Sequence, residues 1–214
     1  MSLPPRTRPG LKLLPLAALT LIAVAACAPV SAGAAAVVGK QRLTTTSLQT
    51  SVRQLLAEGG GGGQPTDQLL RNTVDRWVYE QLIDRVARAR GVTVTAGDIA
   101  AKAAQVKAQG GEAGYRQAVI ASGAPFADAD ELVRLVVQLQ RLGVQLVPGS
   151  ASADPTALAN ARQAAIDKLV IAEAGKVDVD VSPRYGQFDP ASATVAPLQS
   201  GGLAVDAQTY QQMK

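Results

Sequence analysis

The 214-residue chain contains a single cysteine and no histidine. The missing histidine excludes a histidine general base, a histidine-ligated metal and a Ser-His-Asp triad within this chain. A histidine-free mechanism such as Ser-Lys catalysis stays open, although no motif points to one. With one cysteine, an internal disulfide is also excluded. We therefore expect no catalytic residue, no metal site and no cofactor, and we expect that the protein is not an enzyme.

Aromatic residues and methionine are scarce, with one Trp, two Phe, four Tyr and two Met in the whole chain. Apolar contacts to any ligand would therefore come mainly from Leu, Val and Ala. Such contacts are weak and nonspecific, because they lack the large surfaces that aromatic side chains bury. This composition suits a binder of unfolded chains better than a tight site for a small molecule.

The cysteine stands at the end of an apolar run near the N-terminus. Arg6, Arg8 and Lys12 precede the uncharged segment 13–26, which is shorter than the ~20 apolar residues of a spanning helix and fits a secretory signal. The sequence Val-Ala-Ala-Cys that ends at Cys27 resembles the bacterial lipobox. This resemblance implies cleavage before Cys27 and a diacylglyceryl thioether on its sulfur, which would hold the protein on the extracytoplasmic face of the cell membrane. The alternatives are an ordinary secretory signal with a chance cysteine and a cytosolic chain with an apolar N-terminus.

Removal of the predicted signal peptide changes the charge of the protein. The chain has 21 basic and 17 acidic residues, and residues 1–26 carry three of the basic ones. The mature chain therefore keeps 18 basic and 17 acidic residues, a net charge of +1. This balance gives no support to nucleic-acid binding.

Apolar residues recur at helical spacing through most of the mature chain. The pattern predicts six helices: one between the hydroxyl cluster 45–47 and the glycine run 59–63, and others at about 66–90, 95–109, 114–121, 125–142 and 155–174. On the longest helix, charges of alternating sign surround Arg85, Arg88 and Arg90. This mixture of charges favours a solvated helix face. The alternative is that the three arginines contact anionic lipid or an acidic partner.

Strict alternation of valine and aspartate over 177–181 predicts a half-buried strand. Its expected partner is the short apolar run 36–38, so the two ends of the domain should meet. After this strand the composition loses its period. The predicted organisation is then complete: signal peptide 1–26, tether 27–35, helical domain 36–189 and disordered tail 190–214.

The order of these segments resembles a known family. "AAVVGKQRL" leads into a helix, a long helix ends in "ARARGVTVTAGDIA", and "GYRQAVIASGAPFADADELVR" and a final "VDVDVSPRYG" follow. This order is similar to that of the SurA N-terminal-like family, which includes SurA, PrsA and the peptide-binding region of trigger factor, and the ending looks like its actinobacterial lipoprotein members. The resemblance implies a mainly α fold of about six helices closed by a small two-stranded β element. It also implies binding of extended, unfolded chains in an apolar cleft.

The parvulin domain of SurA and PrsA is missing here, because only "VPGSASADP" separates the last two predicted helices. The expected function is therefore chaperone-like binding of unfolded or exported polypeptides by a membrane-anchored lipoprotein without catalysis. The alternative is a structural or interaction lipoprotein that docks a specific envelope partner. An open apolar cleft would support the first function, and a filled core would count against it. The candidate cleft residues are Trp77, Val78, Leu82, Leu135 and Leu139, with core packing as the alternative for Trp77.

Overall fold

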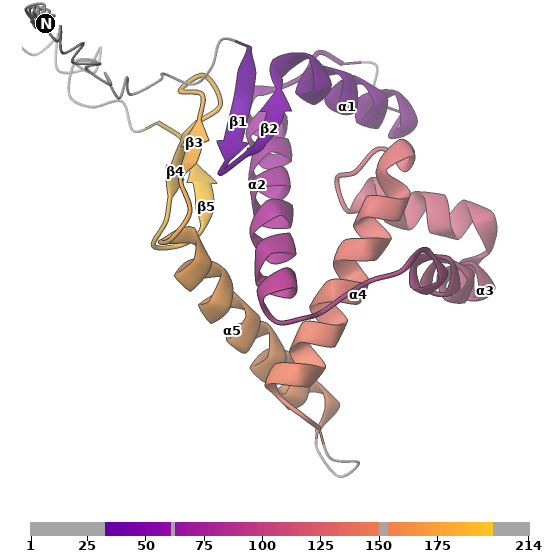
Figure 1. Cartoon of the computed structure of the whole chain (residues 1–214). Coiled ribbons are helices and arrows are strands. Elements are labelled where there is room, and N and C mark those ends of the chain that lie inside the picture. The colour runs from indigo at the N-terminus through magenta and orange to yellow at the C-terminus, as the bar shows by residue number, and fades with distance from the viewer. Residues whose placement is uncertain (1–32, 61–62, 150–153, 199–214) are drawn as a thin grey trace, which may run out of the picture.

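The computed structural model describes residues 33–60, 63–149 and 154–198. The predicted signal peptide, Cys27 and residues 199–214 lie outside this part of the chain. The described elements are β1 (Ala34–Val38), β2 (Gln41–Thr44), α1 (Thr45–Glu58), α2 (Asp67–Ala89), α3 (Ala96–Ala121), the short 3-10 helix η1 (Phe126–Asp128), α4 (Ala129–Leu146), α5 (Pro155–Ala174), β3 (Val179–Val181), β4 (Gln187–Asp189) and β5 (Thr194–Ala196). The prediction of a mainly helical fold with a small β element is confirmed (Figure 1).

Side-chain caps fix where most helices begin. The hydroxyls of Thr44 and Thr66 accept hydrogen bonds from backbone amides in the first turns of α1 and α2. At α3, Thr95 and Asp98 form a reciprocal capping box, as their spacing predicts. Asp154 caps α5 in front of a proline at the first helical position. The hydroxyl cluster 45–47 was expected to supply the cap of α1, but the cap is Thr44, the residue just before it.

The described residues form five α-helices where six were predicted. The expected helices 95–109 and 114–121 are one element, α3, which kinks at Gly111. Gly111 has φ 67° and ψ −175°, a conformation that is essentially restricted to glycine. The helix therefore bends at Gly111, and a second helical segment continues directly after this residue.

The two ends of the domain meet in a sheet, as predicted. Ala36 pairs with Val181 and Val38 with Val179 in an antiparallel arrangement. However, the sheet has three strands in the order β2-β1-β3, because β1 also forms a hairpin with β2 through a turn at Gly39. The strand begins at Ala34, and both Ala34 and Ala35 are buried. The predicted tether 27–35 is therefore too long by two residues at its C-terminal end.

The prediction of disorder from residue 190 is wrong for the described residues up to 198. β4 and β5 form an antiparallel hairpin in which Phe188 pairs with Val195. Val195 is buried, and its backbone amide donates to Asp75 Oδ1 on α2 at 2.6 Å. The hairpin is thus held by packing on α2, a tertiary contact that a composition argument does not detect.

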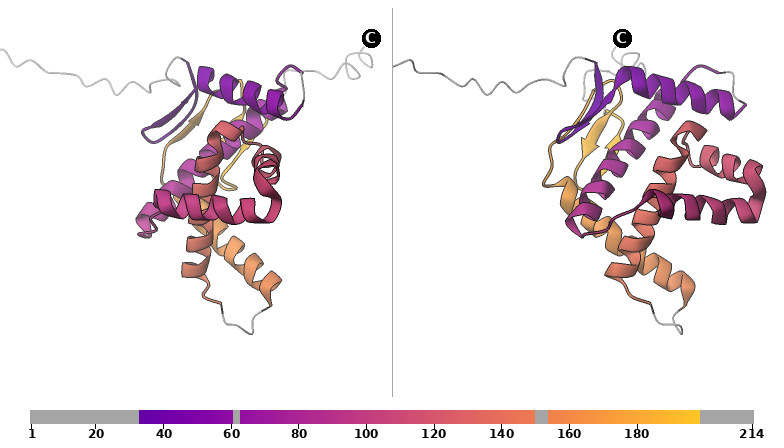
Figure 2. Two further views of the ribbon diagram at one scale, coloured as in Figure 1. Left: turned by 90° about the vertical axis from the view of Figure 1, so that its right-hand side faces the viewer. Right: turned by 45° about the vertical axis from the view of Figure 1, so that its right-hand side comes forward.

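Two separate apolar cores lie on either side of α4. The main core joins β1, α1, α2, one face of α4, α5, β3 and β5, and its largest fully buried side chains include Leu48, Leu82 and Leu142. A smaller core lies between α3, η1 and α4 around Tyr115, Val119 and the α4 residues Ala129, Val133 and Val137. We call the elements around the main core the main lobe. We call α3, η1 and the α4 face of the small core the arm, which stands away from the β-strands in Figures 1 and 2.

Candidate functional site

The predicted client cleft between α2, α4 and α5 is filled. Val78 and Leu82 are fully buried in the main core. Leu135 and Leu139 are half-buried and pack against the same core. These four residues therefore contribute to stability, and they do not line an open apolar cleft. Trp77 also contacts the main core, but it faces a different cavity as well.

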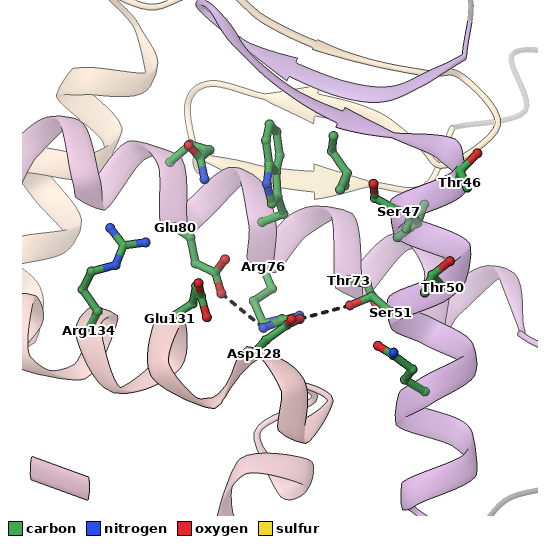
Figure 3. Close-up of a pocket in the computed structure, with 15 residues that line it drawn as sticks. Thr46, Ser47, Thr50, Ser51, Thr73, Arg76, Glu80, Asp128, Glu131 and Arg134 are labelled. Atoms are coloured by element: carbon green, nitrogen blue, oxygen red, sulfur yellow. Dashed lines mark hydrogen bonds and ion pairs between the residues drawn. The ribbon is translucent and has the colours of Figure 1, made fainter. Parts of the chain in front are cut away.

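That cavity has a volume of about 500 Å³ and lies between α1 and α2. η1 and the first turns of α4 form its third wall, as Figure 3 shows. We call it the α1–α2 pocket. Most of the residues that line it are polar or charged: Thr46, Ser47, Thr50, Ser51, Gln54, Thr73, Arg76, Glu80, Gln81, Asp128, Glu131 and Arg134.

The wall formed by α1 carries a row of hydroxyl and amide groups. Thr46, Thr50 and Gln54 recur every four residues, so they share one helix face, and Ser47 and Ser51 lie beside them. The opposite face is apolar: it buries Leu48, Val52 and Leu55, of which Leu48 and Val52 belong to the main core. The periodicity of α1 thus explains why its hydroxyls face the pocket.

The wall formed by α2 contains an arginine with an unused donor. Arg76 Nη1 pairs with Glu80 Oε1 at 3.2 Å. The Nε atom of Arg76 is buried and has no hydrogen-bond partner among the described residues. A buried donor without a partner is rare in native structures, since it loses its hydrogen bonds to water.

The third wall is dominated by negative charge. Asp128 Oδ2 accepts a hydrogen bond from Ser51 Oγ at 3.1 Å, which links α1 to the start of α4. Arg134 also lines the pocket, but its Nη1 contacts both carboxylate oxygens of Asp84 at 2.9 and 3.0 Å. Neither Asp128 nor Glu131 has a cationic partner within the described residues. These two carboxylates therefore leave uncompensated negative charge at the pocket wall.

The same charges affect the protonation of Glu80. Burial raises the pKa of Glu80, and the nearby Asp128 and Asp84 raise it further. The guanidinium groups of Arg76 and Arg134 act in the opposite direction. Burial is the largest of these causes, so the raised pKa of Glu80 reflects mainly the poor solvation of its charged form. Any attraction of the pocket for a cation comes instead from Asp128 and Glu131 on the third wall.

The pocket presents groups that can bind a ligand. It offers hydrogen-bond donors and acceptors, charges of both signs and one indole face. Within the described residues, no three Cys, Asp or Glu side chains are grouped so that they could hold a metal ion. The pocket thus supports polar recognition of a ligand by residues from three elements.

Sequence reasoning identified Trp77 but missed the rest of this pocket. The run Thr45–Ser47 was read as a helix cap, and 125–128 as the start of a helix. A usable signal was the hydroxyl row itself, because Thr46, Thr50 and Gln54 occupy one face of a predicted amphipathic helix. No spacing pattern, however, relates α1 to Asp128, which is 77 residues away from Ser51.

Within the described ranges, none of the helices has the length and apolar character that crossing a membrane requires. Comparison of the chain with family models, with curated proteins and with solved structures found no match.

Proposed function

We propose that the protein is a lipoprotein, tethered to the extracytoplasmic face of the cell membrane through Cys27, that docks a polypeptide segment of a specific envelope partner in the α1–α2 pocket. The observation that carries this proposal is the pocket itself, a cavity of about 500 Å³ lined mostly by polar and charged residues beside a filled apolar core. Its role is recognition without catalysis.

Docking of a defined partner agrees with this geometry better than general binding of unfolded chains. A general chaperone needs more contiguous exposed apolar surface than most monomers show. Here the exposed large apolar residues of the described chain are Val136, Val144, Ile171 and Leu198. A polar pocket instead discriminates between ligands, because a ligand that leaves its buried donors and acceptors unpaired binds poorly. The main core fills the region in which the SurA-like resemblance places a client cleft.

The charges of the pocket indicate what kind of segment would bind. Asp128 and Glu131 line the pocket without a cationic partner among the described residues, and they favour a lysine or arginine side chain. The hydroxyls of α1 can both donate and accept, so they can pair with either group of a peptide backbone. We therefore expect an extended, basic segment of the partner in the pocket.

Photo-crosslinking tests this expectation. A crosslinking amino acid at Thr50, on the pocket wall, should capture one partner in a stoichiometric complex. The same group at the exposed Gln163 on α5 serves as the control position. The double variant Asp128→Asn/Glu131→Gln should reduce capture at Thr50 at least tenfold, since it removes both unpaired charges. Asp130→Asn, an exposed carboxylate of the same helix turn outside the pocket, should leave capture unchanged.

Two results would contradict docking in the pocket. One is equal capture by the double variant and the Asp130→Asn control. The other is suppression of aggregation of several unrelated unfolded proteins, undiminished in the double variant, because such activity would favour the chaperone-like function.

The tether is tested separately. Cys27→Ser should release the protein from the membrane fraction or leave it as an uncleaved precursor. Mass spectrometry of the wild-type N-terminus should find an acylated cysteine at the first position. Unchanged partitioning of the variant into detergent would refute lipid attachment.

A further inference from the structure

A second hollow, of about 430 Å³, is lined by cations from three parts of the chain. It lies where the β1–β2 turn, the C-terminal half of α2 and the connection between α5 and β3 meet. We call it the basic hollow. Its cationic residues are Lys40, Arg85, Arg88 and Lys176.

Backbone and side-chain contacts hold these segments together. Gly39 of the turn donates its amide hydrogen to the carbonyl of Asp178 at 2.8 Å. Gly39 has φ 58°, and a Cβ atom there would be in van der Waals contact with Arg85 Nη1, at 3.6 Å. Arg85 is held in turn by Glu173, whose Oε1 lies 2.9 Å from Arg85 Nε. The hollow is therefore a fixed meeting point of residues that are far apart in sequence.

Positive charge predominates in the basic hollow. Glu173 neutralises Arg85, and Asp178 is the one acidic residue in the lining. Lys40, Arg88 and Lys176 are exposed and have no ion-pair partner within the described ranges. An arginine fork together with ammonium groups matches the oxygens of a phosphate group.

We propose that the basic hollow binds the phosphate of an anionic lipid headgroup in the membrane to which Cys27 is attached. This inference rests on the tether of the proposed function and is independent of the partner in the α1–α2 pocket. Binding at both points would fix the orientation of the domain on the membrane. The sequence left two interpretations open for Arg85 and Arg88, a solvated face or contact with anionic lipid. Under this proposal both residues contact lipid.

The length of the tether permits this contact. Seven residue steps separate Cys27 from Ala34, and a fully extended chain covers about 23–25 Å over that distance. The basic hollow lies beside the end of β1, four residue steps beyond Ala34, or about 13 Å along a strand. Since the tether is longer than the strand, the domain can turn so that the end of β1 reaches the surface that holds Cys27.

Vesicle binding tests the proposal without the acyl chains. Residues 27–214 with Cys27→Ser contain every described residue, so the fold is retained while the lipid is lost. This protein should sediment with vesicles that contain one third phosphatidylglycerol at 0.1 M salt. It should not sediment with pure phosphatidylcholine vesicles, and 0.5 M salt should abolish binding, because salt screens exposed charges.

Charge-removing variants locate the contact. Arg88→Gln/Lys176→Gln should weaken binding to the anionic vesicles about 30-fold, since each cation near such a surface contributes about fivefold. The control Arg53→Gln/Lys168→Gln removes one exposed arginine and one exposed lysine from α1 and α5, outside the hollow. It should weaken binding much less. Circular dichroism should show that both double variants remain folded.

Several outcomes would overturn the proposal. Equal weakening by the two double variants would mean that overall charge, and not the hollow, binds the vesicles. Titration with inorganic phosphate distinguishes the two sources of the same chemistry: saturation of the amide shifts around Lys40 and Lys176 at micromolar phosphate would assign the hollow to a soluble anion. Loss of partner crosslinking at Thr50 would not affect vesicle binding. The experiments therefore distinguish failure of docking in the α1–α2 pocket from failure of lipid binding in the basic hollow.

Discussion

In the main lobe, α2 is packed on several sides, by α1, α4, α5, β1 and β5, whereas α3 in the arm packs against α4 and η1. The two helices have similar lengths, 23 and 26 residues. Yet α2 buries eight side chains and α3 buries two, Tyr115 and Val119. The difference follows from composition, because α2 carries Leu, Ile and Val on its inner face while α3 is rich in Ala, Gly and Gln. Less burial means less hydrophobic stabilisation, so we expect the arm to open at lower free energy than the main lobe.

Polar contacts compensate in part for the small arm core. Arg141 on α4 bonds both to the Asp98 carboxylate and to the carbonyl oxygen of Thr93, and so fixes the start of α3. Glu58 of α1 accepts a hydrogen bond from the Phe126 amide at 2.6 Å and lies 3.7 Å from Arg116. Half-exposed ion pairs of this kind contribute about 0–1 kcal/mol each. The comparison teaches that packing determines the stability of the main lobe, while charge and backbone conformation position the arm.

The largest expected effect is in the main core. Leu82→Ala removes a fully buried side chain and should lower the free energy of unfolding by about 2–5 kcal/mol, because it leaves a cavity. Denaturant unfolding followed by the fluorescence of Trp77, the one tryptophan, measures this loss in the main lobe. The matched arm variant Val119→Ala should speed amide exchange in α3 and leave the Trp77 midpoint in place. An equal shift of that midpoint by both variants would show that the two cores unfold as one unit.

The kink of α3 gives the next largest effect. Gly111→Ala should destabilise the arm by about 1–3 kcal/mol, since an alanine cannot adopt its backbone conformation without strain. A Cβ atom at Gly111 would meet no atom within 4 Å, so backbone strain is the cause. Gly110→Ala, in the helical residue just before it, also meets open space and should stabilise the arm by about 0.5–1 kcal/mol. Amide exchange of α3 measures both changes, and equal effects of the two substitutions would contradict a kink at Gly111.

The parts of the fold that sequence reasoning predicted depend on local pattern. The inner face of α2 follows from helical spacing of Leu70, Val74, Val78 and Leu82, which are all buried. The caps of α2 and α3 follow from the chemistry of threonine. The pairing of β1 with β3 follows from alternation in 177–181 and the need of an isolated strand for a partner.

The parts that were missed depend on contacts between distant residues. β5 is a strand because it packs on α2 beside Asp75, 120 residues earlier in the chain. The glycine pair 110–111 is compatible both with the end of a helix and with a kink in a longer one. The helix continues here because residues before and after the pair pack in the small arm core. The α1–α2 pocket joins three elements, so no segment contains its pattern. Helix periodicity correctly places Val78 and Leu82 on the apolar face of α2. It does not predict whether other helices pack on that face or leave it open as a cleft.

A smaller effect concerns the pH dependence of the arm. Hydrogen bonds from the Thr95 backbone, Arg141 and the Thr95 hydroxyl lower the pKa of Asp98 from 3.8 to about 2. A lowered carboxyl pKa gives stability that is present above pH 3.8 and is lost as the pH falls through about 2. Asp98→Asn should therefore speed amide exchange in the first turns of α3 at pH 6, and the difference from wild type should be much smaller near pH 2. The amides of α5 serve as an internal control, and a difference of the same size at pH 2 and pH 6 would exclude ionisation of Asp98 as its cause.

The smallest expected effect has the opposite sign and lies in the main lobe. Because burial raises the pKa of Glu80 above 4.5, the folded protein holds its proton more tightly than the unfolded chain. The resulting stability is present below pH 4.5 and is lost as the pH rises through the raised pKa. Glu80→Gln mimics the protonated side chain, so the stability of wild type relative to this variant should decrease from pH 4 to pH 7. Unfolding curves by Trp77 fluorescence measure the decrease, with Asp130→Asn as a control outside the pocket. An increase over the same range would mean that the pair with Arg76 outweighs burial and that the folded protein favours the ionised form of Glu80.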